Sequence, residues 1–330
     1  MRRLLLVALV FALPAQAVTI DWVAVGNPNN LADTPSTNCN AADCGSIDHA
    51  YYISKYETTN AQYAEFLNAK AASDPLGLYN ESMGSDATFG GITQSGVSGS
   101  YTYTAKVGFE NKPVTYVSFY DSLRFSNWLN NGQESGDTER GAYTLLGGTA
   151  VPSNGLTVMR NTGPGPGAIT FLPSENEWYK AAYYDALSAT YFDYPTGTDS
   201  VTDCVAPGSD TGNSANCYPN PYPAGSLTNA GAYGLSDSPY GTYDQGGNVW
   251  EWNEEIVVSG LYRGLRGGDW YGIASYLAAS YPSYMLPTLE YGYVGFRVAS
   301  LVPEPGPGLL GTMGVLSVLV LSASRRRRAN

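Results

Sequence analysis

The pattern of hydrophobic and polar positions predicts three helices and two strands in this 330-residue chain. Each predicted helix opens on serine or threonine, followed three residues later by glutamine or an acidic residue, which is the pattern of a capping box. Apolar and aromatic side chains then recur at helical spacing, so helices are expected directly after Thr59, Ser118 and Ser174. Residues 20–25 and 50–56 are rich in β-branched and aromatic residues and are predicted strands.

Between these elements the chain consists of short strand-like pieces separated by glycine, asparagine and proline. Residues 73–113 and 131–168 are interpreted as long insertions. No period of about 20–50 residues is visible, so a repeat protein is not predicted. The composition, with 38 glycines, 20 prolines and 27 tyrosines, favours a loop-rich, aromatic-rich globular protein over a helical bundle.

The first 17 residues have the pattern of a secretory signal peptide. Two arginines precede an apolar run over residues 4–13, and residues 15–17 (A-Q-A) are typical of a cleavage site. A buried first helix is the less favoured alternative. The run is too short to serve as a permanent membrane anchor, so export is expected.

The C-terminal end carries a second targeting pattern. Residues 302–305 read V-P-E-P, residues 308–323 are apolar, and four arginines follow at 325–328. This order is similar to the PEP-CTERM sorting tail of Gram-negative bacteria. The resemblance implies a C-terminal hydrophobic helix that anchors the protein transiently in the inner membrane, with exosortase and the secretion machinery as partners. After processing, the protein would reach the cell surface or an extracellular matrix; an ordinary tail anchor is the alternative.

Charge and histidine content exclude several classes of function. The net charge of −12 combines basic ends with a body that holds 11 basic and 28 acidic residues, a net of −17. Phosphate binding needs a basic surface, so nucleic acid is not an expected partner. The single histidine, His49, excludes sites built from two or three histidines and is interpreted as a structural or surface residue.

The four cysteines fall into two close pairs, Cys39 with Cys44 and Cys204 with Cys217. Three pairings are possible in principle, and pairing within each close pair is the simplest. Both pairs lie in loops rich in glycine, asparagine and aspartate. In an exported protein this favours disulfides over catalytic thiols or zinc ligands.

Six blocks of the body carry a family resemblance. They are YYISKYETTNAQYAEFLNA (51–69), KPVTYVSFYDSLRFSNWLN (112–130), FLPSENEWYKAAYYD (171–185), YGTYDQGGNVWEWNEE (240–255), LRGGDW (265–270) and VGFRVAS (294–300). In this order they resemble the formylglycine-generating enzyme family, also called sulfatase-modifying factor. The resemblance covers about residues 20–300. It implies one large domain with an irregular, loop-rich α+β fold of the C-type-lectin-like kind. That domain is placed at 18–301, between the signal peptide (1–17) and the sorting segment (302–330).

The resemblance implies an enzyme that oxidises a cysteine in a sulfatase peptide to formylglycine with copper, oxygen and two cysteines. Here Gly272 and Leu277 stand at the two cysteine positions, and no cysteine follows Cys217. Copper(I) needs soft thiolate ligands, so copper is not expected and no catalytic residue is assigned. Relatives that use a three-histidine iron site are excluded as models because the chain has one histidine.

The resemblance also implies calcium beside the G-N-x-W-E-W block. The matching ligands are the side chains of Asp244 and Glu251 and the backbone carbonyls of Gly247 and Val249. Carboxylates and carbonyls at close spacing suit Ca²⁺. In the alternative interpretation Asp244 caps a turn and Glu251 bonds backbone N–H groups. Arg297, in the G-F-R block, is interpreted as a buried partner of carboxylates.

The residues expected to line a ligand pocket come from the same blocks: Trp250, Arg266, Asp269, Trp270 and Tyr271. They adjoin a tyrosine-dense segment, and tyrosine offers a large amphipathic contact surface. The sequence therefore favours an exported, non-catalytic cell-surface or matrix protein that binds a glycan or a protein. The alternatives are a divergent formylglycine-generating-type oxidoreductase, acting on a protein or small substrate, and a purely structural matrix component.

Overall fold

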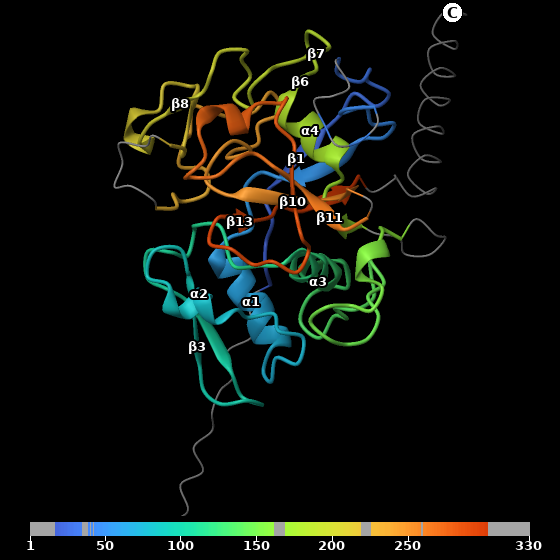
Figure 1. Cartoon of the computed structure of the whole chain (residues 1–330), viewed down its shortest axis with the longest axis vertical. Coiled ribbons are helices and arrows are strands. Elements are labelled where there is room, and N and C mark those ends of the chain that lie inside the picture. The colour runs from blue at the N-terminus through green and yellow to red at the C-terminus, as the bar shows by residue number, and fades with distance from the viewer. Residues whose placement is uncertain are drawn as a thin grey trace, which may run out of the picture.

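Two four-stranded sheets lie at the centre of the computed structural model, which describes residues 17–34, 39, 41, 43–161, 169–218, 226–258 and 260–302. The first has the order β1-β2-β14-β5 and is antiparallel throughout. The second has the order β12-β11-β10-β13, with β13 parallel to β10. Figure 1 shows these strands between α4 on one side and α1 and α3 on the other. The strands of the two sheets are β1 (Trp22–Val25), β2 (Tyr51–Ser54), β5 (Thr170–Phe171), β10 (Trp250–Val257), β11 (Tyr262–Arg266), β12 (Ser283–Met285), β13 (Val294–Gly295) and β14 (Ala299–Leu301).

The three predicted helices are confirmed. They begin after Thr59, Ser118 and Ser174, and in each the cap side chain accepts the N–H of the third helical residue, whose side chain bonds back to the cap. These capping boxes satisfy backbone donors that have no partner inside a helix, so a few local residues fix where each helix starts. The four α-helices are α1 (Asn60–Lys70), α2 (Glu81–Ser85), α3 (Phe119–Asn130) and α4 (Glu175–Tyr183), of which α2 was not predicted.

The main core contains a group of packed aromatic rings between α1 and α3. The ring of Phe125 lies 5.5 Å from Phe66, 6.0 Å from Tyr63 and 5.3 Å from Phe296, measured between centroids. All four side chains are fully buried. Stacked and edge-to-face aromatic contacts at these distances add to the free energy of burial and fix the relative position of the two helices.

The two segments interpreted as insertions are integral parts of the fold. The first contains α2 and a hairpin of β3 (Ile92–Ser95) and β4 (Thr102–Ala105), whose Tyr103 exchanges two backbone hydrogen bonds with the Asn68 side chain of α1. The second supplies the carbonyl of Val158, which accepts a 2.8 Å hydrogen bond from the Arg263 side chain. Two smaller strand pairs complete the strands: β6 (Tyr184–Asp185) with β7 (Thr190–Tyr191), and β8 (Asp203–Cys204) with β9 (Ser214–Ala215).

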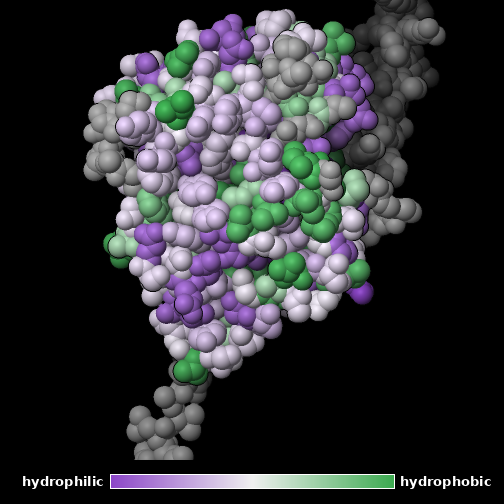
Figure 2. All heavy atoms as spheres, in the orientation of Figure 1, coloured by the Kyte–Doolittle hydropathy of each residue, from purple (hydrophilic) through white to green (hydrophobic). Residues whose placement is uncertain are grey.

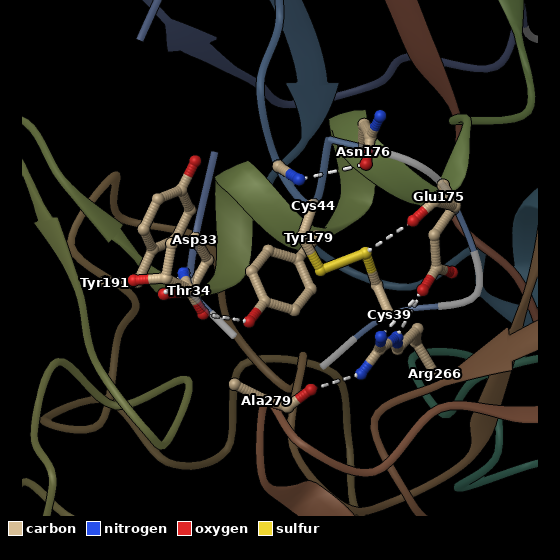
Figure 3. The surroundings of a disulfide bond; sticks show 12 residues. Asp33, Thr34, Cys39, Cys44, Glu175, Asn176, Tyr179, Tyr191, Arg266 and Ala279 are labelled. Atoms are coloured by element: carbon tan, nitrogen blue, oxygen red, sulfur yellow. Dashed lines mark hydrogen bonds and ion pairs between the residues drawn. A yellow bond between two sulfur atoms is a disulfide. The ribbon is translucent and has the colours of Figure 1, made fainter. Parts of the chain in front are cut away.

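Both expected disulfides form, Cys39 with Cys44 and Cys204 with Cys217, and the described residues contain no free cysteine. Figure 3 shows the first disulfide next to the Tyr179 ring and close to an Arg266–Glu175 ion pair. It belongs to a small buried cluster with Trp178 and Tyr183. The simplest pairing from the sequence is therefore confirmed.

The face of the molecule drawn in Figure 2 is mostly polar. Figure 2 shows hydrophobic residues gathering mainly in one group, over the region of β10 and β11. The turn between these two strands carries the exposed apolar side chains of Val258 and Leu261. A polar surface elsewhere agrees with the strongly acidic body of the chain.

The mixed, loop-rich fold expected from the sequence is confirmed, and strands lie within both predicted strand segments. The signal peptide and the apolar C-terminal helix fall almost wholly on residues 1–16 and 303–330, which lie outside the described residues. Within the described part of the chain, no helix has the length and apolar character needed to cross a bilayer.

Candidate functional site

The R-G-G-D-W block folds back beside the start of β10. Gly267 and Gly268 follow β11 with φ angles of 99° and 74°, which residues with side chains rarely adopt. A Cβ atom at Gly267 would lie 3.0 Å from the carbonyl oxygen of Gln245, so this close approach also needs glycine. The turn brings the backbone N–H of Trp270 to the carbonyl of Asn248 at 3.0 Å, next to Trp250.

Asp269 is the buried acid of this turn, with 7% of its surface exposed. Its Oδ1 accepts hydrogen bonds from the backbone N–H groups of Tyr271 (3.1 Å) and Gly272 (2.5 Å). Burial raises the pKa of Asp269 to about 6, although hydrogen bonds from those N–H groups and from the Trp250 side chain act in the opposite direction. Asp269 therefore changes charge close to neutral pH.

Aromatic side chains surround Asp269. Tyr276 and Tyr281 stack with centroids 4.5 Å apart, and each lies within 6.3 Å of the Trp250 ring. Trp270 contacts Tyr271 at 5.5 Å. Tyr271 is 69% exposed and Tyr281 is 37% exposed. We call these five residues, Trp250, Trp270, Tyr271, Tyr276 and Tyr281, the aromatic cluster.

Trp270 carries an unsatisfied donor. Its ring stacks on Phe89 at 4.5 Å, which holds the indole in one orientation. Its Nε1 is buried and has no hydrogen-bond partner. A buried N–H without an acceptor costs free energy, so a ligand acceptor at this atom would be favourable.

Other tyrosines of the dense segment separate into distinct groups. Tyr291 and Tyr293 stack on one another at 5.0 Å. Tyr284 packs instead on Tyr262, at 5.1 Å, across β11 and β12. The segment from Tyr271 to Tyr293 is therefore not one continuous binding surface.

Arg266 does not line a ligand site, contrary to the sequence expectation. Its side chain is fully buried, and its Nη2 lies 2.7 Å from Oε1 of Glu175. Its Nη1 donates to the carbonyl of Ala279 at 2.7 Å (Figure 3). As the last residue of β11, it points toward α4, so it links the second sheet to that helix.

The two positions that the resemblance associates with cysteine are occupied in different ways. A Cβ at Gly272 would lie 2.9 Å from the Tyr276 ring and 3.0 Å from Oδ1 of Asp269, so little space exists for a longer side chain. Leu277 is fully buried in an apolar cluster with Tyr194 and Cys217. Neither position presents a metal ligand, so the residues do not fit copper bound by two thiolates.

The expected calcium ligands are already engaged. Glu251 Oε1 accepts from Arg297 Nη2 at 2.7 Å, and its Oε2 accepts from Arg297 Nε (2.7 Å) and Trp178 Nε1 (2.6 Å). Asp244 accepts the backbone N–H of Gly231 at 2.5 Å. The residues as they lie therefore do not fit a calcium ion, because the ion would have to displace Arg297 from Glu251.

The remaining two expected calcium ligands, Gly247 and Val249, are buried beside β10. No group of three or more histidine, cysteine, aspartate or glutamate side chains suited to a metal occurs in the described ranges. The interpretation of Arg297 as a buried partner of carboxylates agrees with its ion pair to Glu251.

His49 lies apart from the aromatic cluster. Its side chain is 40% exposed and stands between Asp48, at 2.7 Å from Nδ1, and Glu177, at 3.4 Å from Nε2. A hydrogen bond to Glu177 is the main cause that raises the pKa of His49 above its ordinary value. His49 thus lies between an exposed acid, Asp48, and a buried one, Glu177, which also pairs with Arg160.

Sequence reasoning missed Phe89 as a support of this site, whereas Tyr276 and Tyr281 belong to the tyrosine-dense segment that it singled out. Phe89 lies in the segment interpreted as an insertion, about 180 residues before Trp270 in a contact that only the tertiary structure creates. The density of tyrosine after residue 271 was a usable signal for the other two.

Comparison with known proteins identifies a family and a fold. The family model described as "Sulfatase-modifying factor enzyme 1-like domain" matches residues 21–302. Among solved structures, CarF covers 87% of this chain and 100% of its own, with a TM-score of 0.57 and 20% identity. Treponema denticola variable protein 1 covers 88% of this chain and 98% of its own, with a TM-score of 0.53 and 19% identity. At these identities the likeness concerns the fold alone.

Curated relatives match a smaller part of the chain. Hercynine oxygenase of Mycobacterium tuberculosis is 29% identical over 146 residues, which are 39% of this chain and 32% of that protein. Hercynine oxygenase of Mycolicibacterium thermoresistibile is 30% identical over 162 residues, 41% of this chain and 34% of that protein. The chain thus spans about a third of the length of the curated relatives it matches.

Proposed function

The chain belongs to the sulfatase-modifying factor enzyme 1-like family, and from this premise we propose that it is a non-catalytic, exported binding protein of the cell surface or extracellular matrix. Its ligand is a glycan or a protein, bound at the aromatic cluster. The observation that carries the proposal is the pair of exposed rings, Tyr271 next to Asp269 and Tyr281 next to Trp250.

The chemistry of the aromatic cluster supports a glycan in particular. Flat, exposed tyrosine rings offer apolar faces with a hydroxyl at the edge, at a low cost in side-chain entropy. The carboxylate of Asp269 can accept a hydroxyl, and the unpartnered Nε1 of Trp270 can donate. Sugar rings present apolar C–H faces and hydroxyl groups together, so they match both features.

A binding experiment tests this function. The purified protein is applied to a glycan array and to matrix polysaccharide, and hits are measured by titration calorimetry. Tyr271→Ala and Tyr281→Ala each remove an exposed ring and should weaken binding about tenfold, the effect of losing about 1.4 kcal/mol. Tyr284→Ala is the matched control, because Tyr284 is 48% exposed but packs on Tyr262 outside the cluster.

Two results contradict the proposal. One is the absence of any glycan or matrix-protein ligand, which favours the purely structural alternative. The other is a ligand whose affinity falls equally in all three tyrosine variants, because a general loss of structure would then explain the effect.

An oxidoreductase is the second candidate, because curated relatives are named hercynine oxygenase. The described cysteines are all in disulfides and the whole sequence has one histidine, so the chain lacks the residues for either metal site considered above. We expect no oxygen uptake when copper and cysteine-containing peptides are added. Oxygen consumption with stoichiometric copper would show that the non-catalytic proposal is wrong.

Export through the signal peptide and sorting by exosortase remain part of this proposal, with residues 308–323 as the transient inner-membrane anchor of a Gram-negative cell. Intact-mass measurement of the protein released from the cell surface tests both ends. We expect Val18 at the N-terminus and loss of the apolar segment at the C-terminus. A full-length mass in the matrix fraction would contradict processing.

Calcium as a structural cofactor also stays a prediction, made less favourable by the Glu251–Arg297 pair. An ion that binds the folded state alone raises the melting temperature. Melting curves with calcium and with chelator therefore test it. Equal melting temperatures in both conditions would exclude a stabilising calcium site.

A further inference from the structure

A cavity of about 750 Å³ lies away from the aromatic cluster and shares no wall residue with it. Its wall combines the segment before β1, the connection from β2 into α1, and the loop at 229–232. This volume is in the range of cavities that take a small organic ligand and far exceeds that of one ion. We call it the acidic cavity because three acidic residues line it.

The wall of the acidic cavity is negative and polar. It includes the carboxylates of Asp21, Glu57 and Glu65, together with serine, threonine, asparagine and glutamine side chains, and no lysine or arginine. The neighbouring Lys55 lies over the rings of Tyr56 and Tyr243 and is not part of the wall. Low-dielectric walls that carry one sign of charge focus the field inside a cavity, so a cation is favoured there.

Further negative charge lies directly behind the wall. Asp244 is buried, and it accepts a hydrogen bond from the backbone N–H of Gly231, which is a wall residue. Burial, and then the nearby carboxylates of Asp244 and Glu251, raise the pKa of Glu57 well above its ordinary value. One guanidinium, Arg297, faces these three carboxyl groups and pairs with Glu251, so Glu57 and Asp244 have no cationic partner of their own. A cation in the cavity would favour the ionised form of both.

Glu57 and Thr58 supply the independent sign of a missing partner. Glu57 is 1% exposed; its Oε2 accepts from Asn248 at 2.8 Å, and its Oε1 has no hydrogen-bond partner. Thr58 is 2% exposed and its Oγ1 is also without a partner. Both residues line the cavity. Each buried oxygen without a partner is costly, and a donor from a ligand would relieve that cost.

We propose that the acidic cavity binds a small hydroxylated amine of the amino-sugar class, with its ammonium group at the Glu57 and Thr58 end. An ammonium group offers three donors and a positive charge, which suit the two free oxygens and the acids that have no cationic partner. Hydroxyl groups of the ligand suit the amide and hydroxyl side chains of the wall, among them Gln62, Asn111 and Asn229. The site is separate from the aromatic cluster, so it does not rest on the function proposed above.

Titration calorimetry with a charged and a neutral sugar tests the proposal. Glucosamine carries the ammonium group, and N-acetylglucosamine is the matched probe without the charge. We expect glucosamine to bind and N-acetylglucosamine to bind about tenfold more weakly or not at all, the loss expected when a charge-assisted hydrogen bond is removed. Failure of glucosamine to bind, or equal affinity for the two sugars, overturns the proposal.

Variants locate the site. Glu57→Gln keeps the acceptor for Asn248 and removes the ionisable carboxyl group. Glu65→Gln removes a carboxylate at a partly exposed wall position, which guards against a folding defect in the first variant. Both should weaken glucosamine binding about tenfold. Glu134→Gln, an exposed position outside the wall, is the matched control and should leave it unchanged.

Two further measurements distinguish the acidic cavity from the aromatic cluster and from a calcium site. Tyr271→Ala should not change glucosamine affinity, because Tyr271 belongs to the aromatic cluster; a loss there places the amine in that cluster and overturns the proposal. Titration with calcium chloride alone should give no heat that depends on Glu57. Calcium binding that disappears in Glu57→Gln identifies a metal site in place of an amine site.

Discussion

Replacing Asp269 by asparagine should change how the stability of the protein depends on pH. Burial raises the pKa of Asp269 from 3.8 to about 6, so the folded protein holds this proton more tightly than the unfolded chain does. The resulting stability is fully present below the unfolded pKa and is lost as pH rises through the folded pKa. The difference between the two pKa values corresponds to a loss on the order of 3 kcal/mol between about pH 4 and pH 7.

Asparagine keeps an oxygen for the backbone N–H groups of Tyr271 and Gly272, but it has no charge to desolvate. It gives up part of the hydrogen bonding that the carboxylate supplies, including that to Trp250, at a cost of about 1 kcal/mol. The variant should therefore be slightly less stable than the wild type near pH 4 and more stable, by about 1–2 kcal/mol, near pH 7. The two stability curves should cross between these values.

Urea unfolding followed by tryptophan fluorescence, at four pH values across this range, measures the difference. Asp244 also titrates at about 6, but it contributes equally to both proteins and cancels. A difference in unfolding free energy that stays constant from about pH 4 to pH 7 would refute the reasoning, because Asp269 would then have the same pKa in both states.

Three other predictions follow from buried and cross-linked groups. Arg297→Leu should lower the unfolding free energy by about 3–5 kcal/mol in chemical denaturation, because it leaves Glu251 buried and unpaired, and near-normal stability would contradict that. Exchange of Cys204 and Cys217 for serine should cost about 3 kcal/mol in the same assay, since their disulfide closes a loop with a sequence separation of 13, and unchanged stability under oxidising conditions would count against it. His49→Gln should remove a small stabilisation that is present below about pH 6.5 and fades at higher pH, seen as a difference in melting temperature between acidic and neutral buffer; a pH-independent difference would argue against the raised pKa of His49.

What the sequence could predict was local. The capping boxes at Thr59, Ser118 and Ser174 lie within four residues of the helices they start, so their signal needs no tertiary information. Short, close cysteine pairs could be matched for the same reason. The family assignment rested on the order of short motifs, which a single sequence displays in full.

The sequence could not predict the direction in which side chains face, or the contacts between residues that are far apart in the chain. Arg266 occupies a block that also carries Asp269, yet strand alternation turns it toward Glu175 in the interior. Glu57 lies in an ordinary-looking stretch, and its raised pKa depends on burial and on Asp244, Glu251 and Arg297, all about 190 residues or more further along the chain. Such long-range electrostatic environments leave no periodic signal in the sequence.

The position of β14 has a mechanical consequence for a protein displayed on a surface. Ala299–Leu301 form an inner strand, hydrogen-bonded on one side to β2 and on the other to β5. A pull applied to the chain at Val302 therefore loads two ladders at once, and neither can open alone to release the strand. Tension from a C-terminal attachment would enter the first sheet at an inner strand, so the domain should resist forced unfolding from that end better than an edge strand would allow.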